Sequence, residues 1–191
     1  ERRQRVLADP PLRLSGDRLS GVVNAVPDGM AAHACLLLVD GRLVLADLAG
    51  PGVERRAQQS IDPARPLARL AFAEAPVELL EAQNGAGIAA RVVDGAAVLL
   101  AFEAVGGAER ALHAARDYVM QRRAFGRLVG SFQAVKHKLA DMFAQIEIAR
   151  AHAYYGAWAM ASGAEELPRA AAAARVAATT AYTLAAEEGL H

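Results

Sequence analysis

The spacing of apolar residues changes near the middle of this 191-residue chain, and that change constrains the fold more than any other feature. Up to about residue 80, short apolar runs alternate with turn residues, as in β-strands. From about residue 95, apolar residues recur every three or four positions, as in amphipathic helices. Because one pattern cannot serve both kinds of element, the sequence predicts an α+β chain with a β domain followed by a helical domain.

Three apolar runs in the first part are expected to be strands, at residues 35–39, 42–46 and 67–72, and residues 12–19 bracket a Ser-Gly-Asp turn. Asp40-Gly41 joins two of them and is a preferred dipeptide of the two-residue type I′ hairpin. Short strands with turn signals at this spacing predict a small antiparallel barrel or sandwich over residues 1–80.

Residues 81–94 are rich in Gly and Ala and are predicted to be a linker between the two domains. Helices are expected over residues 95–123, 132–161 and 168–188, with Asp94 as the N-cap of the first. Because alanine lets helix backbones approach closely, these helices predict an antiparallel bundle over residues 95–191. The stripe of the second helix would comprise Phe132, Val135, Leu139, Met142, Phe143, Ile146, Ala149 and Ala153.

Charge and cysteine usage exclude several functions. The chain has 21 basic and 21 acidic residues and no basic block, so no surface for nucleic acid is expected. Its apolar runs are too short to span a bilayer, and no targeting pattern opens the sequence. The lone Cys35 cannot form an internal disulfide and is expected to be a small buried side chain. A soluble, cytoplasmic protein is predicted; because Glu1 is not an initiator methionine, the sequence is expected to be part of a longer one.

The junction between the first two helices carries the most chemistry. Phe125-Gly126 and Gly130 should break the helical pattern, and Ser131 is expected to be the N-cap of the next helix. An anion would be favoured there, because Arg122 and Arg123 supply charge-assisted donors and the free amides of a helix N-terminus add to them. These residues alone leave open a structural reading, in which Arg122 caps a helix end and Gln133 is only solvated.

In register, these residues resemble the signature of the acyl-CoA dehydrogenase family, Y-x-x-x-R-x-x-F-G…F-Q…L-A-D-M. The matching residues are Tyr118, Arg122, Phe125-Gly126, Phe132-Gln133 and Leu139-Ala140-Asp141-Met142. The resemblance implies the family's middle β domain and C-terminal helical bundle, incomplete at both ends, with a fourth helix beyond His191. It also implies FAD-dependent α,β-dehydrogenation of an acyl-CoA thioester, as in fatty-acid or steroid side-chain degradation.

The resemblance assigns cofactor-binding roles to three residues. In the family, the matching Arg, Phe and Gln contact the adenosine-pyrophosphate half of an FAD held mainly by a neighbouring subunit. Carried over, these are Arg122, Phe125 and Gln133. The resemblance thereby implies a homo- or hetero-oligomer, with a dimer of dimers expected, and a protein that accepts the electrons.

No catalytic residue is assigned. Most family members take their catalytic base from a Glu that would lie beyond His191, and others place it where this chain has Ala96, followed by Ala97 instead of Arg. The family's Trp-Ile-Thr-Asn-Gly segment beside the flavin ring corresponds to residues 25–29. Ala25 stands at the Trp position, and Pro27 replaces the Thr without a hydroxyl or an N–H.

The other titratable residues predict structural roles. His113, His137 and His152 lack metal-ligand spacing, so no metal site is expected. Asp141 and the pair Glu147 and Arg150 are expected to form a helix-surface or intersubunit network.

Three functions remain open from the sequence. The chain could belong to a complete acyl-CoA dehydrogenase, or be one of two unlike subunits whose partner supplies the flavin-ring pocket and the base. A non-catalytic scaffold derived from the family, without flavin, is the alternative of a different class. An acyl-CoA oxidase, which reoxidises its flavin with oxygen, is a further variant of the first reading.

Overall fold

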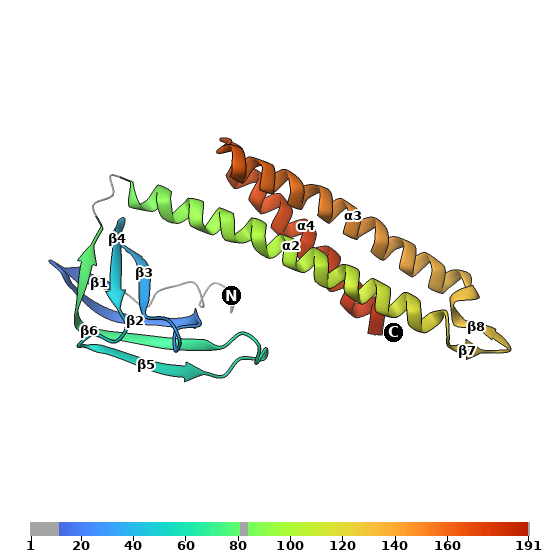
Figure 1. The fold of residues 1–191 in the computed structure, drawn as a ribbon, viewed down its shortest axis with the longest axis horizontal. Coiled ribbons are helices and arrows are strands. Elements are labelled where there is room, and N and C mark those ends of the chain that lie inside the picture. The colour runs from blue at the N-terminus through green and yellow to red at the C-terminus, as the bar shows by residue number, and fades with distance from the viewer. Residues whose placement is uncertain (1–11, 81–83, 191) are drawn as a thin grey trace, which may run out of the picture. The chain divides into compact units, whose positions relative to one another are not determined.

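The computed structural model describes residues 12–80 and 84–190. The chain divides after Ala89 into two compact units, one of antiparallel strands and one of helices (Figure 1). This arrangement confirms the predicted α+β class, with antiparallel strands followed by a helical part.

The first unit is built around its longest strand, β6. The strands are β1 (Arg13–Ser15), β2 (Arg18–Pro27), β3 (Ala34–Val39), β4 (Arg42–Asp47), β5 (Val53–Gln58) and β6 (Leu67–Leu79). Their order is β1-β2-β6-β4-β3, with β5 also paired to β6, and every pair is antiparallel. Because β6 pairs with three strands, it carries much of the buried core, including Leu70 and Phe72.

The β3–β4 hairpin forms as the sequence predicts. Val39 pairs with Arg42, and Asp40 and Gly41 have φ angles of 50° and 76°, as a type I′ turn requires. β5 was not predicted, because Glu54, Arg55 and Arg56 interrupt any apolar run there. That strand is defined by its pairing with β6, which local sequence does not show.

The helices are α2 (Gly85–Val119), α3 (Gln133–Ser162) and α4 (Leu167–Leu190). The predicted start of the first helix at residue 95 was wrong, since α2 begins at Gly85, within the stretch predicted as a linker. Asn84 caps this helix, because its Oδ1 accepts a hydrogen bond from the Gly87 N–H at 2.8 Å. Asp94 is therefore an interior helical residue and not an N-cap.

Buried apolar side chains, most of them alanines, fill the interface between the helices of the second unit. Met142, Ile146, Ala149 and Ala153 are buried, as the stripe on the second helix predicted. Phe143 was assigned to the same stripe wrongly, since 57% of it is exposed. Its position is one residue past Met142, which turns its side chain about 100° around the helix axis. α3 ends at Gly163, whose φ of 66° suits a glycine C-cap. Within the described residues, no helix is long and apolar enough to cross a membrane.

Candidate functional site

A short hairpin replaces the loop predicted between α2 and α3. β7 (Arg123–Ala124) and β8 (Arg127–Leu128) pair antiparallel, and Phe125-Gly126 forms the two-residue turn between them (Figure 1). Both turn residues have positive φ, 52° at Phe125 and 78° at Gly126. Glycine adopts this conformation freely, but it is unfavourable for a bulky side chain such as phenylalanine. A strained residue held in place is a reason to look for a function at the turn.

The Phe125 side chain projects into solvent at the tip of this hairpin. It is 95% exposed, and its ring makes one aromatic contact, an edge-to-face contact with Phe132. The two ring centroids lie 6.4 Å apart at an interplanar angle of 84°. The guanidinium carbon of Arg127 lies 3.9 Å from the centroid of the Phe132 ring. Phe132 is thus held between two residues of the hairpin.

The prediction that Ser131 caps α3 was wrong. Ser131 ends a 3₁₀ turn, η1 (Val129–Ser131), and its hydroxyl donates to the Leu128 carbonyl at 2.6 Å. The N-cap is Phe132, which has no side-chain acceptor to offer. No acidic residue lies in the first turn of α3. The N–H groups that open this helix therefore lack a side-chain cap and can donate to an anion.

Arg122 lies at the base of the hairpin with its backbone fixed. Its N–H donates to Tyr118 at 2.9 Å, and its carbonyl accepts from the Val129 N–H at 2.8 Å. Its side chain is exposed and forms no ion pair within the part of the chain that the structure describes. Gln133, also exposed, is the first residue of α3.

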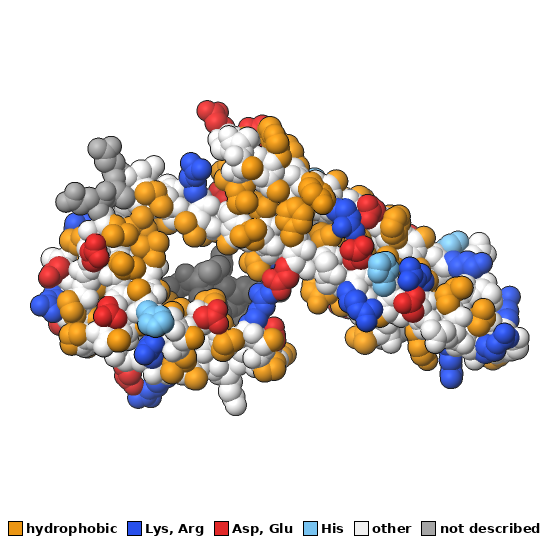
Figure 2. Space-filling view, in the orientation of Figure 1, with side chains coloured by type: hydrophobic (Ala, Val, Ile, Leu, Met, Phe, Trp, Pro, Cys, Tyr) orange, Lys and Arg blue, Asp and Glu red, His pale blue; other side chains and the backbone are white. Residues whose placement is uncertain are grey.

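The structure thus brings Arg122, Phe125 and Gln133 to the same end of the helical unit, at the base of the hairpin, at its tip and at the start of the next helix. Figure 2 shows Lys and Arg side chains gathered over this end. A flat exposed ring, unpaired cationic and amide donors and an uncapped helix start suit a ligand that has both an aromatic ring and phosphate groups.

A pocket that the sequence did not predict lies at the same end of the helical unit. Its volume is about 420 Å³, and residues of α2, η1, α3 and α4 line it. Most of the lining is apolar, and Lys138 and Glu188 form an ion pair there. Arg122, Phe125 and Gln133 are not part of its wall.

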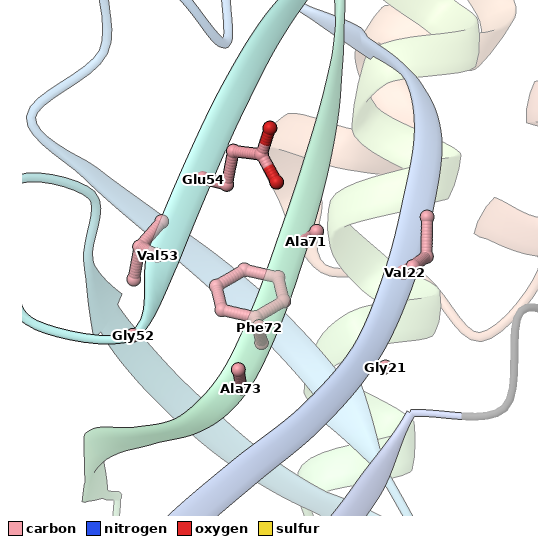
Figure 3. A pocket seen from close by; sticks show the side chains of 8 residues that line it. All are labelled: Gly21, Val22, Gly52, Val53, Glu54, Ala71, Phe72 and Ala73. Carbon is pink, nitrogen blue, oxygen red and sulfur yellow. The ribbon is translucent and has the colours of Figure 1, made fainter.

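A second depression, of about 390 Å³, lies over the sheet (Figure 3). Glu54 is the only charged residue among those lining it. Its carboxylate already accepts a hydrogen bond from the Nε of Arg56 at 2.6 Å. With its one charged group engaged, this surface offers little to orient a ligand.

The strand end that corresponds to the family's flavin-ring segment is a β-bulge. The register between β2 and β6 shifts between Val23 and Val26, and Ala25 has a φ of 55°. Pro27 ends the strand. Neither residue offers a side-chain hydrogen-bond donor or acceptor.

The remaining polar residues predicted to be structural lie outside any such cluster. The Nε of Arg150 donates a hydrogen bond to Oε1 of Glu147 at 3.1 Å, and its guanidinium also pairs with Glu109 at 3.4 Å. The hydrogen bond that Glu147 accepts raises the pKa of Arg150 above its ordinary value. Ala96 and Ala97, which stand where some family members have a catalytic base and an Arg, lie within α2.

No metal site is found in the described ranges. No three His, Cys, Asp or Glu residues lie close enough there to hold a metal ion, and His113, His137 and His152 belong to no such group.

Comparison with known proteins decides the family. Residues 83–191, more than half of the chain, match the family described as acyl-CoA dehydrogenase, C-terminal domain. The chain belongs to the acyl-CoA dehydrogenase family. It is 41% identical over 131 residues to the acyl-CoA dehydrogenase IpdE2 of Mycobacterium tuberculosis, covering 69% of this chain and 37% of IpdE2.

Two solved structures also share the fold. The Tcur3481-Tcur3483 steroid ACAD has a TM-score of 0.84 at 28% identity, covering 97% of this chain and 52% of that one. The ChsE4-ChsE5 complex of Mycobacterium tuberculosis has a TM-score of 0.85 at 25% identity, with the same coverage. The chain therefore spans about half the length of these relatives.

Proposed function

We propose that this chain is a subunit of an FAD-dependent enzyme that dehydrogenates an acyl-CoA thioester between its α and β carbons. In this proposal the chain supplies Arg122, Phe125 and Gln133 to the adenosine-pyrophosphate half of an FAD held mainly by a neighbouring subunit. The observation that carries it is the hairpin end of the helical unit, where a cation and an aromatic ring are exposed beside an uncapped helix start.

The residues present fit that half of the cofactor. Pyrophosphate is anionic, and a guanidinium binds it with charge-assisted hydrogen bonds. The Phe125 ring offers a flat apolar surface to the adenine, and its exposure of 95% leaves that surface accessible. The Gln133 amide can donate and accept hydrogen bonds at the adenosine end. FAD, when bound, would supply the acceptor for the hydride that leaves the substrate's β carbon.

The roles of the three residues differ in kind. Arg122 would neutralise phosphate charge, and the two backbone hydrogen bonds of Arg122 would keep its side chain at the hairpin base. Phe125 would cover the adenine and exclude water from it. Gln133 would orient the adenosine, since it extends directly from the rigid start of α3.

We further propose that the partner is an unlike family member, in a hetero-oligomer. In support, the residues that reach into a neighbour's flavin site are present, whereas Ala25 and Pro27 lack the polar groups expected beside a flavin ring. Ala96 likewise offers no base. The similarity to a complex of two named chains, ChsE4 and ChsE5, and to a steroid ACAD supports this reading and favours a steroid side-chain thioester as substrate. An electron-accepting protein and a cytoplasmic location complete the proposal.

Two measurements on the full-length polypeptide test it. Flavin absorbance per chain, and acyl-CoA-dependent reduction of an artificial electron acceptor, are compared with and without candidate partner subunits. We expect little flavin and little activity for the chain alone and recovery of both with the right partner. A homo-oligomer with one flavin per chain and a turnover of roughly 1 per second or more would contradict the hetero-oligomer.

The residue assignment has its own test. Arg122→Ala in the assembled enzyme should weaken FAD retention during dialysis, because a charge-assisted contact typically contributes about 1.5–3 kcal/mol. Arg123→Ala is the matched control, since Arg123 is also exposed but extends from β7. Equal flavin loss in the two variants, or none in either, would remove Arg122 from the site.

A further inference from the structure

Deepening the proposed function, on which this step rests, we infer that Phe132 and Arg127 are positioning residues that hold the Phe125 ring ready for the adenosine end of FAD. Neither residue needs to contact the cofactor. They act by fixing the hairpin to the start of α3, so that the distance and orientation between the Phe125 ring and Gln133 stay constant.

The geometry carries the inference. Phe132 belongs to the helix end, because it is the N-cap of α3 and its N–H donates to the Val129 carbonyl at 3.1 Å. Phe125 and Arg127 belong to the hairpin. The Phe125 ring meets the Phe132 ring edge-to-face, with 6.4 Å between the two centroids. The guanidinium carbon of Arg127 lies 3.9 Å from the centroid of the Phe132 ring. A single ring on the helix thus joins two points of the hairpin to it.

The hairpin has little else to hold its tip. Its strands are two residues each, and isolated hairpins of this size are marginally stable in water. Gly126 has no atom within 4 Å of the position that a Cβ would occupy. Phe125, which carries the strained positive φ, is almost fully exposed. Among the described residues, the Ser131 hydroxyl bonds the hairpin at its base, at the Leu128 carbonyl, and the aromatic and cation–π contacts of Phe132 reach its tip and its second strand. These Phe132 contacts can therefore keep the turn in its observed shape.

Order in the hairpin matters for binding because a mobile ring must be immobilised when a ligand binds. Preorganisation removes that entropic cost from the binding free energy. Loss of the Phe132 contacts should therefore weaken FAD binding without removing any group that touches FAD. The substrate's own contacts should be unaffected, so KM for acyl-CoA should change less than FAD affinity.

The test uses Phe132→Leu and Arg127→Met, with Phe132→Tyr as the conservative rescue. Arg175→Met is the matched control, because Arg175 is an exposed arginine of α4 without a ring contact. The first readout is the rate of trypsin cleavage after Arg123 in the flavin-free full-length polypeptide. The second is the FAD dissociation constant of the assembled enzyme, from flavin fluorescence. Thermal unfolding shows whether each variant is folded.

We expect Phe132→Leu and Arg127→Met to raise both the cleavage rate and the dissociation constant by roughly threefold to tenfold. Phe132→Tyr and Arg175→Met should leave both near the unmodified value. Faster cleavage with unchanged FAD affinity, or no change in either, would overturn the inference. If Phe132→Leu does not fold, Arg127→Met decides alone, since its side chain is exposed.

An Arg122→Ala arm separates this inference from the proposed function. If Arg122→Ala weakens FAD binding and the Phe132→Leu and Arg127→Met variants do not, the positioning role fails and the cofactor site stands. If Arg122→Ala has no effect, the proposed site itself fails, and the cleavage rates then report only on the hairpin.

Discussion

The backbone N–H of Ala25 donates a hydrogen bond to Oε1 of Gln58 at a distance of 2.7 Å. Ala25 is the residue with positive φ in the bulge of β2, and Gln58 is the last residue of β5. The Gln58 amide also donates to Oδ1 of Asn24, at 3.5 Å. The Gln58 side chain thus gives the Ala25 N–H at the bulge a partner and also bonds the neighbouring Asn24 side chain.

Gln58→Leu should therefore destabilise the β unit. An unsatisfied bulge loses the hydrogen bond and leaves a strained residue unsupported, so the free energy of unfolding should fall by about 1–2 kcal/mol. Gln59→Leu is the control, because Gln59 is the exposed neighbour and its replacement should change stability by less than about 0.5 kcal/mol. Urea denaturation of the full-length polypeptide measures both. Equal effects would show that Gln58 does not hold the bulge.

Two helical glycines should respond in opposite directions to alanine. Gly106 lies inside α2 with no atom within 4 Å of an added Cβ, so Gly106→Ala should stabilise the chain by about 0.5–1 kcal/mol through helix propensity. Gly156 is buried in α3, and an added Cβ would lie 3.0 Å from Cγ2 of Val98, which has no exposed surface.

For Gly156→Ala we expect overpacking to outweigh propensity and lower the stability by about 1–3 kcal/mol. Thermal unfolding of both variants measures the difference. Stabilisation of Gly156→Ala as large as that of Gly106→Ala would show that the helices separate without cost at this contact.

The Cys35 thiol should react slowly. Burial raises its pKa, because the charged thiolate is disfavoured away from water, so at a given pH less thiolate is present than for a free cysteine. Reaction with a disulfide reagent should be slower for the folded chain than for the chain in urea, and it should accelerate as pH rises.

The raised pKa of Cys35 also means that its contribution to the free energy of unfolding falls as pH rises. Below the ordinary thiol pKa both states are protonated and the contribution of Cys35 is fully present. As pH rises, the unfolded state ionises first, so this contribution is lost. Cys35→Ser should remove that part of the pH dependence. Equal reaction rates for folded and unfolded chains at every pH would contradict the raised pKa.

The sequence predicted those features that depend on neighbours in the chain. The Asp40-Gly41 hairpin follows from the dipeptide's own preference, and Met142 and Ile146 are buried as the 3.6-residue period requires. It failed where partners distant in the chain decide. β5 exists because β6 lies beside it. A local signal was also missed: the Asn84 side chain caps α2, so the helix begins at Gly85 in spite of the glycines that follow.

The candidate site likewise has a part that the sequence predicted and a part that it did not. Arg122, Phe125 and Gln133 could be named because residue type and order match a family signature. The type I′ turn at Phe125 could not, since phenylalanine is a poor residue for positive φ. The contacts of Phe132 with Phe125 and Arg127 were also beyond prediction, because side-chain packing and not local preference creates them.

The strain at Phe125 leads to a prediction in which stability and cofactor binding separate. Asparagine adopts positive φ at little cost, and Asn-Gly is a preferred type I′ dipeptide. Phe125→Asn should therefore keep the free energy of unfolding or raise it by up to about 1 kcal/mol. FAD retention in the assembled enzyme should nevertheless fall, because the aromatic surface is gone.

Phe125→Tyr is the matched control, since it keeps the ring and the strained backbone and should retain FAD. Flavin content after dialysis and thermal unfolding are measured on the same samples. Retention of FAD by the asparagine variant would exclude the Phe125 ring from the cofactor site. A clear loss of stability would instead mean that the contact between Phe125 and Phe132 stabilises the turn by more than its strained φ costs.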